Sequence, residues 1–154
     1  MSEQKFTLIS PAFAHGQPIP SRYTCDGSGD VPQLEWIHPP QGTQSFALIV
    51  EDPDAPSGTF THWVRFNIPA QADRISADRD EGVDGKNDFQ ADGYSGPCPP
   101  PNHGRHRYYF RLYALDTDSL DLPGGSKRSA LEAKLQGHVL DEAELMATYE
   151  RTPG

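Results

Sequence analysis

The stretch that decides the fold is the nine-residue run His106-Arg107-Tyr108-Tyr109-Phe110-Arg111-Leu112-Tyr113-Ala114. Successive side chains of a β-strand point to opposite faces, so His106 and Tyr108 share a face with Phe110, Leu112 and Ala114. The pattern predicts a strand with one buried face. Because a polar group in phase with a core face needs a partner, the run also predicts a polar site where the strand begins.

Two further runs pair an apolar face with a polar end. Phe46–Asp52 finishes on Asp52, and Thr61–Ile68 has His62 near its start. Simple alternation places these polar residues in phase with Phe46, Leu48 and Val50 in the first run and with Val64, Phe66 and Ile68 in the second. If the runs pack together, one small pocket at the edge of the core is lined by Asp52, His62, His106 and Tyr108.

Composition supports a β-rich fold. A chain of 154 residues is long enough for one domain with a substantial core, and we treat residues 1–154 as a single domain. With 14 glycines and 15 prolines, many turns and short elements are expected. An all-β sandwich or barrel is therefore favoured over a helical bundle.

The charge balance limits the partners. A net charge of −9 argues against nucleic acid and against an acidic membrane surface as bulk partners. Read as an untrimmed sequence, the chain has no signal-like start and no run of transmembrane length, which favours a cytoplasmic protein without stable membrane insertion. In that compartment Cys25 and Cys98 are expected to be free thiols, although their spacing alone does not show whether they meet.

The remaining elements follow from breakers and periodicity. Short strands are expected at Phe6–Ile9 and Leu34–Ile37, a rigid turn at Asp52–Gly58, and a long polar stretch between Pro69 and Tyr94. A capping box at Ser129–Glu132 predicts a short helix that Gly137 closes. Composition alone would restart a helix over Leu140–Met146.

Two segments of the sequence contain motifs that go beyond the alternation of apolar and polar residues. The first is Ser45-Phe46-Ala47-Leu48-Ile49-Val50-Glu51-Asp52-Pro53-Asp54-Ala55-Pro56, followed by His62-Trp63-Val64 and Asn67-Ile68-Pro69. The second is Gly93-Tyr94-Ser95-Gly96-Pro97-Cys98-Pro99-Pro100, followed by Gly104-Arg105-His106-Arg107-Tyr108 and Leu112-Tyr113-Ala114-Leu115-Asp116. Together they closely resemble the phosphatidylethanolamine-binding protein family, which includes the Raf kinase inhibitor protein. The segments Pro20–Gly27 and Gly137–Leu140 look like the bacterial branch, and the resemblance covers about residues 6–151.

The resemblance implies a β-sandwich with a large antiparallel sheet, a smaller second sheet and a few short helices. It implies an anion pocket at one end of the large sheet, whose ligand-binding residues would be Asp52, His62, Tyr94, Gly96, Cys98, His106 and Tyr108. Because chains of the family end in a strand, Glu142–Arg151 is expected to be at least partly extended despite its composition. Bacterial relatives often have glycine where this chain has Gln90, and they often look dimeric, so a homodimer is an expectation from resemblance.

The candidate residues suit an anionic ligand. The histidine rings and the Tyr108 hydroxyl can donate to phosphate oxygens, and a glycine at position 96 would allow backbone N–H groups to approach. Asp52 is expected to accept from a histidine, raising that ring's pKa, or to meet the amine of an ethanolamine head group. Asp54 is expected to cap its turn, and Arg107 to face away from the pocket and pair with an acidic residue. His103 and Arg105 are expected to be solvated.

Three functions are compatible with this set of candidate residues. The first is a non-catalytic binding protein for small phosphorylated or anionic ligands or phospholipid head groups, with a phosphate-presenting protein such as a kinase as a possible partner. The second is a hydrolase or other enzyme with Asp52, His62 and His106 as acid and base, for which Cys98 is the only nearby nucleophile. The third is a metal site, but His62 and His106 form no local chelate. We expect no catalysis, metal or cofactor, and kinase inhibition does not follow from the fold.

The cysteines have a second interpretation that depends on the resemblance. If the family geometry brings the opening loop near the loop of Gly96, Cys25 and Cys98 could form a disulfide and stiffen the rim of the pocket.

Overall fold

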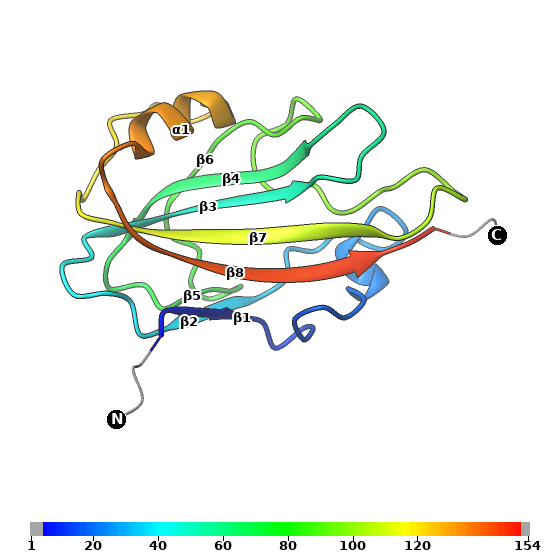
Figure 1. Cartoon of the computed structure of the whole chain (residues 1–154), viewed down its shortest axis with the longest axis horizontal. Helices are drawn as coiled ribbons and strands as arrows, with labels where there is room; N and C mark the ends of the chain where they lie inside the picture. Colours follow the sequence, from blue (N-terminus) through cyan, green and yellow to red (C-terminus); the bar gives the residue numbers. More distant parts are fainter. Residues whose placement is uncertain (1–4, 152–154) are drawn as a thin grey trace.

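A computed structural model describes residues 5–151 of the chain as two antiparallel sheets (Figure 1). The small sheet has the order β1-β2-β5, with bounds Thr7–Ile9, Leu34–Ile37 and Arg74–Ile75. The large sheet has the order β6-β4-β3-β7-β8, with bounds Val83–Asp84, Phe60–Pro69, Ser45–Asp52, His106–Leu115 and Val139–Tyr149. A 3-10 turn η1 (Ser21–Tyr23) and the helix α1 (Arg128–Leu135) complete the fold. The expected sandwich is confirmed.

The large sheet forms the middle layer of the molecule. On one face its apolar side chains, such as Leu48 and Phe110, pack against Leu8 and Trp36 of the small sheet. On the other face Ala47, Ile49, Val64 and Phe66 pack with Leu131 and Leu135 of α1. Because both faces are covered, every residue of β3 is buried, which explains its almost continuous apolar sequence.

The strand β4 departs from simple alternation at two bulges. Val50 pairs with Trp63 but Glu51 pairs with Thr61, so His62 is an extra residue in the ladder. An extra residue reverses the alternation of side chains that follows it. A second irregularity lies opposite Ala47 of β3, close to Asn67, whose backbone has a φ of 55°.

These bulges correct the predicted phase of His62. Val64 and Phe66 pack on the α1 side of the sheet, whereas Trp63 and Ile68 pack on the side of the small sheet. His62 therefore does not share a face with Val64 and Phe66, and the bulge directs it toward the same side as Asp52. The phases predicted for Asp52 and for His106 and Tyr108 are confirmed, because their apolar neighbours belong to the core between the two sheets.

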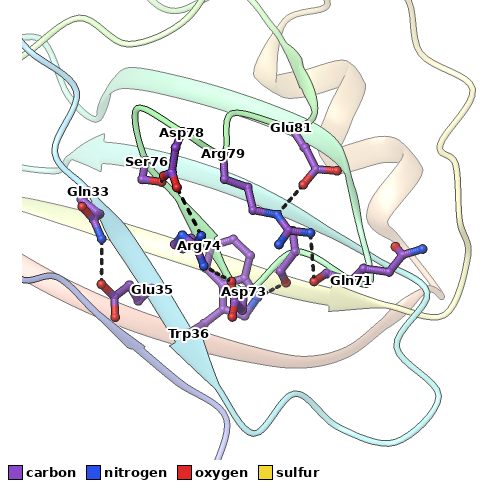
Figure 2. Close-up of polar contacts among 11 residues, drawn as sticks. Gln33, Glu35, Trp36, Gln71, Asp73, Arg74, Ser76, Asp78, Arg79 and Glu81 are labelled. Atoms are coloured by element: carbon purple, nitrogen blue, oxygen red, sulfur yellow. Dashed lines mark hydrogen bonds and ion pairs between the residues drawn. The ribbon is translucent and has the colours of Figure 1, made fainter.

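The polar stretch between Pro69 and Tyr94 is tied down by hydrogen bonds and ion pairs, and it contributes the two short strands β5 and β6. Figure 2 shows its outer contacts beside β2, where Arg79 pairs with Glu81 at 2.7 Å and Arg74 lies 3.1 Å from Asp73. Further along, Gln90 adopts a φ of 66°, the left-handed region that glycine occupies without strain. The loop therefore keeps a glycine-like path although the residue is glutamine.

In the last part of the chain, the structure corrects the predicted capping box and decides against the helix that composition favours over Leu140–Met146. The helix begins at Arg128 and Lys127 makes no side-chain cap, so the predicted capping box is wrong, while Gly137 follows the helix with a φ of 83° as expected. Val139–Tyr149 is a strand paired along β7, which confirms the extended conformation. A long partner strand and the buried alternation of Ala143, Leu145 and Ala147 outweigh helix propensity here.

Within residues 5–151, the structure has no helix that is both long enough and apolar enough to cross a membrane.

Candidate functional site

One end of the large sheet carries a pocket of about 240 Å³. Its polar residues come from three adjacent strands: Asp52 from β3, His62 from β4, and His106 and Tyr108 from β7. The rest of the lining is mostly apolar and comes from loops: Ala55, Pro56, Ser57, Phe60, Phe89, Cys98, Pro99 and Pro100. The structure thus brings together five of the seven residues named from sequence.

Asp52 orients His106. Its Oδ2 accepts a hydrogen bond from His106 Nδ1 at 2.6 Å, and its Oδ1 accepts the backbone N–H of Asp54 at 2.8 Å. Both side chains are almost fully buried. The expectation that Asp52 accepts from a histidine is confirmed, and the bond assigns the Nδ1 proton of His106.

His62 is fixed from its other side by the backbone. Its Nδ1 lies 2.8 Å from the carbonyl oxygen of Ser95, which can only accept, so Nδ1 carries the proton. Burial lowers the pKa of His62 below its ordinary value of 6.5, while the carbonyls of Ser95 and Gly96 and the charge of Asp52 act in the opposite direction. The neutral ring leaves Nε2 without a partner among residues 5–151, and this atom is not sealed from solvent.

Tyr108 supplies a free donor. Within the described residues, its hydroxyl is the buried side-chain polar atom that lacks any hydrogen-bond partner. Burial, the charge of Asp52 and the proximity of the hydroxyl to its carboxylate raise the pKa of Tyr108 well above its ordinary range, although no hydrogen bond of normal geometry joins the two groups. The hydroxyl therefore stays protonated at every physiological pH. A buried and unused O–H in a pocket wall calls for an explanation, and a ligand acceptor is one.

His103, expected in a solvated loop, contacts the pocket residue His106 without lining the pocket itself. Its side chain is exposed, but its Nδ1 lies 2.6 Å from His106 Nε2. Gly104, with a φ of 90°, turns the chain between the two histidines. The signal in the sequence was the spacing itself, since a glycine turn between His103 and His106 can bring residues three apart into contact.

Tyr94 and Gly96 do not line this pocket. The Tyr94 hydroxyl donates to the carbonyl of Tyr23 at 2.7 Å, and its ring packs edge-on against Trp63. A Cβ atom on Gly96 would lie 2.2 Å from the Tyr23 carbonyl oxygen. Glycine at this position therefore permits close packing of two loops, and the structure gives no role to its N–H group in the pocket.

Cys25 and Cys98 form a disulfide. The expectation of free thiols is wrong, because the opening loop packs directly against the loop that carries Cys98 and the backbone N–H of Cys25 donates to the Pro97 carbonyl at 3.1 Å. Cys98 lines the pocket, so the bond fastens the rim to the opening loop. Disulfides are rare in the cytosol of mesophiles, and the cytoplasmic location stays a prediction.

In the turn after β3, the capping role expected for Asp54 is wrong. Asp52, not Asp54, accepts the backbone amide of the turn. Asp54 binds Arg107 through both carboxylate oxygens, with Nη2 at 2.8 Å and Nε at 2.9 Å. These hydrogen bonds lower the pKa of Asp54 to about 2. The expected pairing of Arg107 with an acidic residue away from the pocket is confirmed.

The structure also bears on the two alternative functions, an enzyme with Cys98 as nucleophile and a metal site. Cys98 is held in the disulfide, so it offers no thiolate nucleophile while that bond is intact. Across residues 5–151, no group of three or more histidine, cysteine, aspartate or glutamate side chains is arranged to hold a metal ion.

Fold and pocket together define a β-sandwich with a histidine-containing binding site at one end of its large sheet. The family model described as phosphatidylethanolamine-binding protein matches residues 9–150. This chain belongs to the phosphatidylethanolamine-binding protein family.

Related proteins support the assignment over nearly the whole chain. A UPF0098 protein of Methanothermobacter thermautotrophicus is 51% identical, with 94% of this chain and 98% of the relative covered. A UPF0098 protein of Aquifex aeolicus is 45% identical, with 94% and 88% covered. The crystal structure of a putative phosphatidylethanolamine-binding protein homologue from Chlamydia trachomatis has a TM-score of 0.88 and 38% identity, covering 95% of this chain and 97% of its own. YbcL of Escherichia coli also has a TM-score of 0.88, with 30% identity and 96% and 99% covered.

Proposed function

We propose that this protein is a non-catalytic binding protein that captures a tetrahedral oxyanion, the phosphate group of a small phosphorylated molecule or of a phospholipid head group. The observation that carries the proposal is the Tyr108 hydroxyl, a buried donor in the pocket wall without a partner among residues 5–151. Phosphate oxygens accept such donors strongly. His62 and His106 provide further ring nitrogens around the same space.

The rest of the pocket suits the carbon part of such a ligand. Phe60, Phe89 and the prolines of the rim present apolar surface around the polar floor. The volume of about 240 Å³ lies below the range of about 300 Å³ and more that is typical of pockets for drug-sized ligands. We therefore assign a head group or a small phosphate ester to the pocket, and not a whole lipid.

Binding is favoured over catalysis because the pocket lacks an activated nucleophile. Cys98 is in the disulfide, and Ser57, which also lines the pocket, makes no hydrogen bond to a histidine among residues 5–151. A serine needs such a base to attack an ester. Asp52 is already bonded to His106 and to the Asp54 amide, so it acts as an orienting group.

Two partner proposals rest on family resemblance. A protein that presents a phosphate group, such as a kinase or its substrate, would be held through the same pocket. A homodimer is the proposed oligomeric state, and its formation is checked by sedimentation of the purified protein.

The test is a two-dimensional NMR titration with phosphate, phosphoethanolamine and, as an uncharged control, glycerol. Saturable shifts are expected at His62, His106 and Tyr108 with both phosphates and not with glycerol. They should vanish in His106→Ala and persist in His138→Ala, whose histidine pairs with Asp116, the residue that follows the end of β7 opposite to His106. Absence of shifts in the unmodified protein at millimolar phosphate would reject the proposal.

A further inference from the structure

The bond between His103 and His106 limits what the pocket can offer a ligand. His106 gives its Nδ1 proton to Asp52, and its other nitrogen, Nε2, lies 2.6 Å from His103 Nδ1. A hydrogen bond between two nitrogens contains one proton, so with neutral rings His106 Nε2 accepts and His103 Nδ1 donates. In this state His106 has no N–H left for an anion.

His62 also has no N–H available for an anion, but for a different reason. Its proton is on Nδ1 and is donated to the Ser95 carbonyl, so the neutral ring presents only the lone pair of Nε2. A lone pair repels a phosphate oxygen. With all three histidines neutral, Tyr108 is therefore the one polar side chain among Asp52, His62, His106 and Tyr108 that can donate to a bound oxyanion.

We propose that His103 is a positioning residue of the oxyanion pocket, a latch that occupies His106 Nε2 and makes oxyanion capture depend on the uptake of a proton. The inference rests on the proposed function and adds its regulation. A proton from solvent bonds to His106 Nε2, and the hydrogen bond from His103 breaks. The freed Nε2–H then donates to the oxyanion.

The surroundings allow the latch to move. The His103 side chain is exposed, and Gly104 beside it has a φ of 90° with open space where a Cβ would lie. Rotation of the ring toward solvent therefore meets no packed neighbour at this glycine. His106, by contrast, is buried and held by Asp52, so the pair opens by movement of His103.

The groups around His106 leave its Nε2 as the one position on this ring for a second proton. Titratable groups face His106 from each neighbouring element: Asp52 and Asp54 from β3 and its turn, His62 from β4, Arg107 and Tyr108 from β7, and Tyr149 from β8, the cross-strand partner of His106. Arg105 precedes His106 in the chain, and the Arg151 side chain pairs with Asp26. Asp52 already holds the proton at Nδ1, and Asp54 is neutralised by Arg107. The open position for another proton on His106 is thus the one that His103 covers.

Sulfate is the probe that tests the latch, because its charge of −2 does not change between pH 5.5 and pH 8 as that of phosphate does. Its affinity is measured by NMR titration across this range for the unmodified protein, His103→Ala, His103→Asn and the control His138→Ala. Binding by the unmodified protein should strengthen as the pH falls. His103→Ala should bind about fivefold to tenfold more tightly at pH 7.5, because one competing hydrogen bond is gone.

His103→Asn places an amide N–H near the position of Nδ1 and should restore the weak binding of the unmodified protein, while His138→Ala should not differ from it. If His103→Ala matches the unmodified protein or binds more weakly with the same pH profile, the latch is rejected and the oxyanion pocket stands. If the unmodified protein fails to bind sulfate even at pH 5.5, the latch and the proposed function both fall.

Discussion

The large sheet carries two polar clusters, each built on buried side chains, whose hydrogen-bonding groups are in different states. In the arginine cluster, formed by Trp63, Arg65, Asp80 and Asp84, the Arg65 guanidinium binds both oxygens of Asp84, at 2.8 and 3.1 Å, and also binds Asp80. The Trp63 indole donates to Asp84 at 3.1 Å. In the pocket, the Tyr108 hydroxyl has no partner within residues 5–151 and His62 Nε2 is unused.

The contrast separates structural from ligand-binding polar groups. The hydrogen bonds of Asp84 and Asp80 raise the pKa of Arg65 despite its burial, so its charge is kept and its donors are used. A satisfied network of this kind stabilises one arrangement of the chain. Hydrogen-bond donors without a partner in a concave site destabilise the fold, and a ligand that accepts hydrogen bonds from them removes this penalty.

Removing the disulfide should have the largest effect. The bond links residues separated by 73 positions, and closing a loop of this size stabilises the fold by about 4 kcal/mol in the chain-entropy account. The double variant Cys25→Ser, Cys98→Ser should lose about this much unfolding free energy in urea, and sulfate binding should weaken because the rim is released. Equal stability of the unmodified protein with and without a dithiol reductant would contradict the pairing.

Arg65→Met should lower the unfolding free energy by about 2 kcal/mol, because it removes the charged hydrogen bonds to the partly buried Asp84, whereas the exposed Asp80 contributes little. Sulfate affinity should stay within twofold of the unmodified value. The matched control is Arg74→Met, whose ion pairs are exposed (Figure 2) and should contribute less than about 0.5 kcal/mol. A loss of sulfate binding in Arg65→Met would mean that the two clusters are not independent.

Tyr108→Phe should separate binding from stability. Removing a buried hydroxyl that has no partner should leave the unfolding free energy unchanged or raise it by up to about 1 kcal/mol. Sulfate affinity should fall about tenfold, the cost of one hydrogen bond to a charged acceptor. Tyr94→Phe is the control, since its hydroxyl binds the Tyr23 carbonyl and its removal should destabilise the fold without weakening sulfate binding. Destabilisation by Tyr108→Phe would point to a structural hydroxyl.

His62 should produce the smallest effect, a pH dependence of stability. Above its ordinary pKa of 6.5 the ring is neutral in the folded and unfolded chains, and its contribution is fully present. As the pH falls below 6.5, the unfolded chain binds a proton before the folded one, so stability falls until the lowered pKa of the folded state is passed.

At pH 6.0 this loss is at most about 0.8 kcal/mol relative to pH 7.5, the value when only the unfolded chain binds the proton. Urea unfolding of His62→Asn should show a smaller decline than the unmodified protein, whereas His138→Asn should not. Parallel declines in all three proteins would mean that the pKa of His62 is not lowered in the folded state.

Sequence reasoning succeeded where a residue's position depends on its own strand. The alternation in β3 and β7 placed Asp52, His106 and Tyr108 on the core face, and the family resemblance added the correct sandwich and the strand at the end of the chain. Both strands keep regular pairing with each other, so period-two alternation holds along them.

The tertiary structure decided what depends on contacts between distant segments. His62 reaches the pocket through a bulge that exists only in the pairing of β4 with β3, which alternation within one run cannot reveal. Gly96 and Cys98 acquire their roles from the opening loop packed against them, more than 70 residues away in sequence. The hydrogen-bonded series Asp52–His106–His103 likewise requires the end of β3, the start of β7 and the bend at Gly104 to come together. Local sequence therefore determined which chemical groups are present. Long-range packing determined which of those groups lack a hydrogen-bond partner.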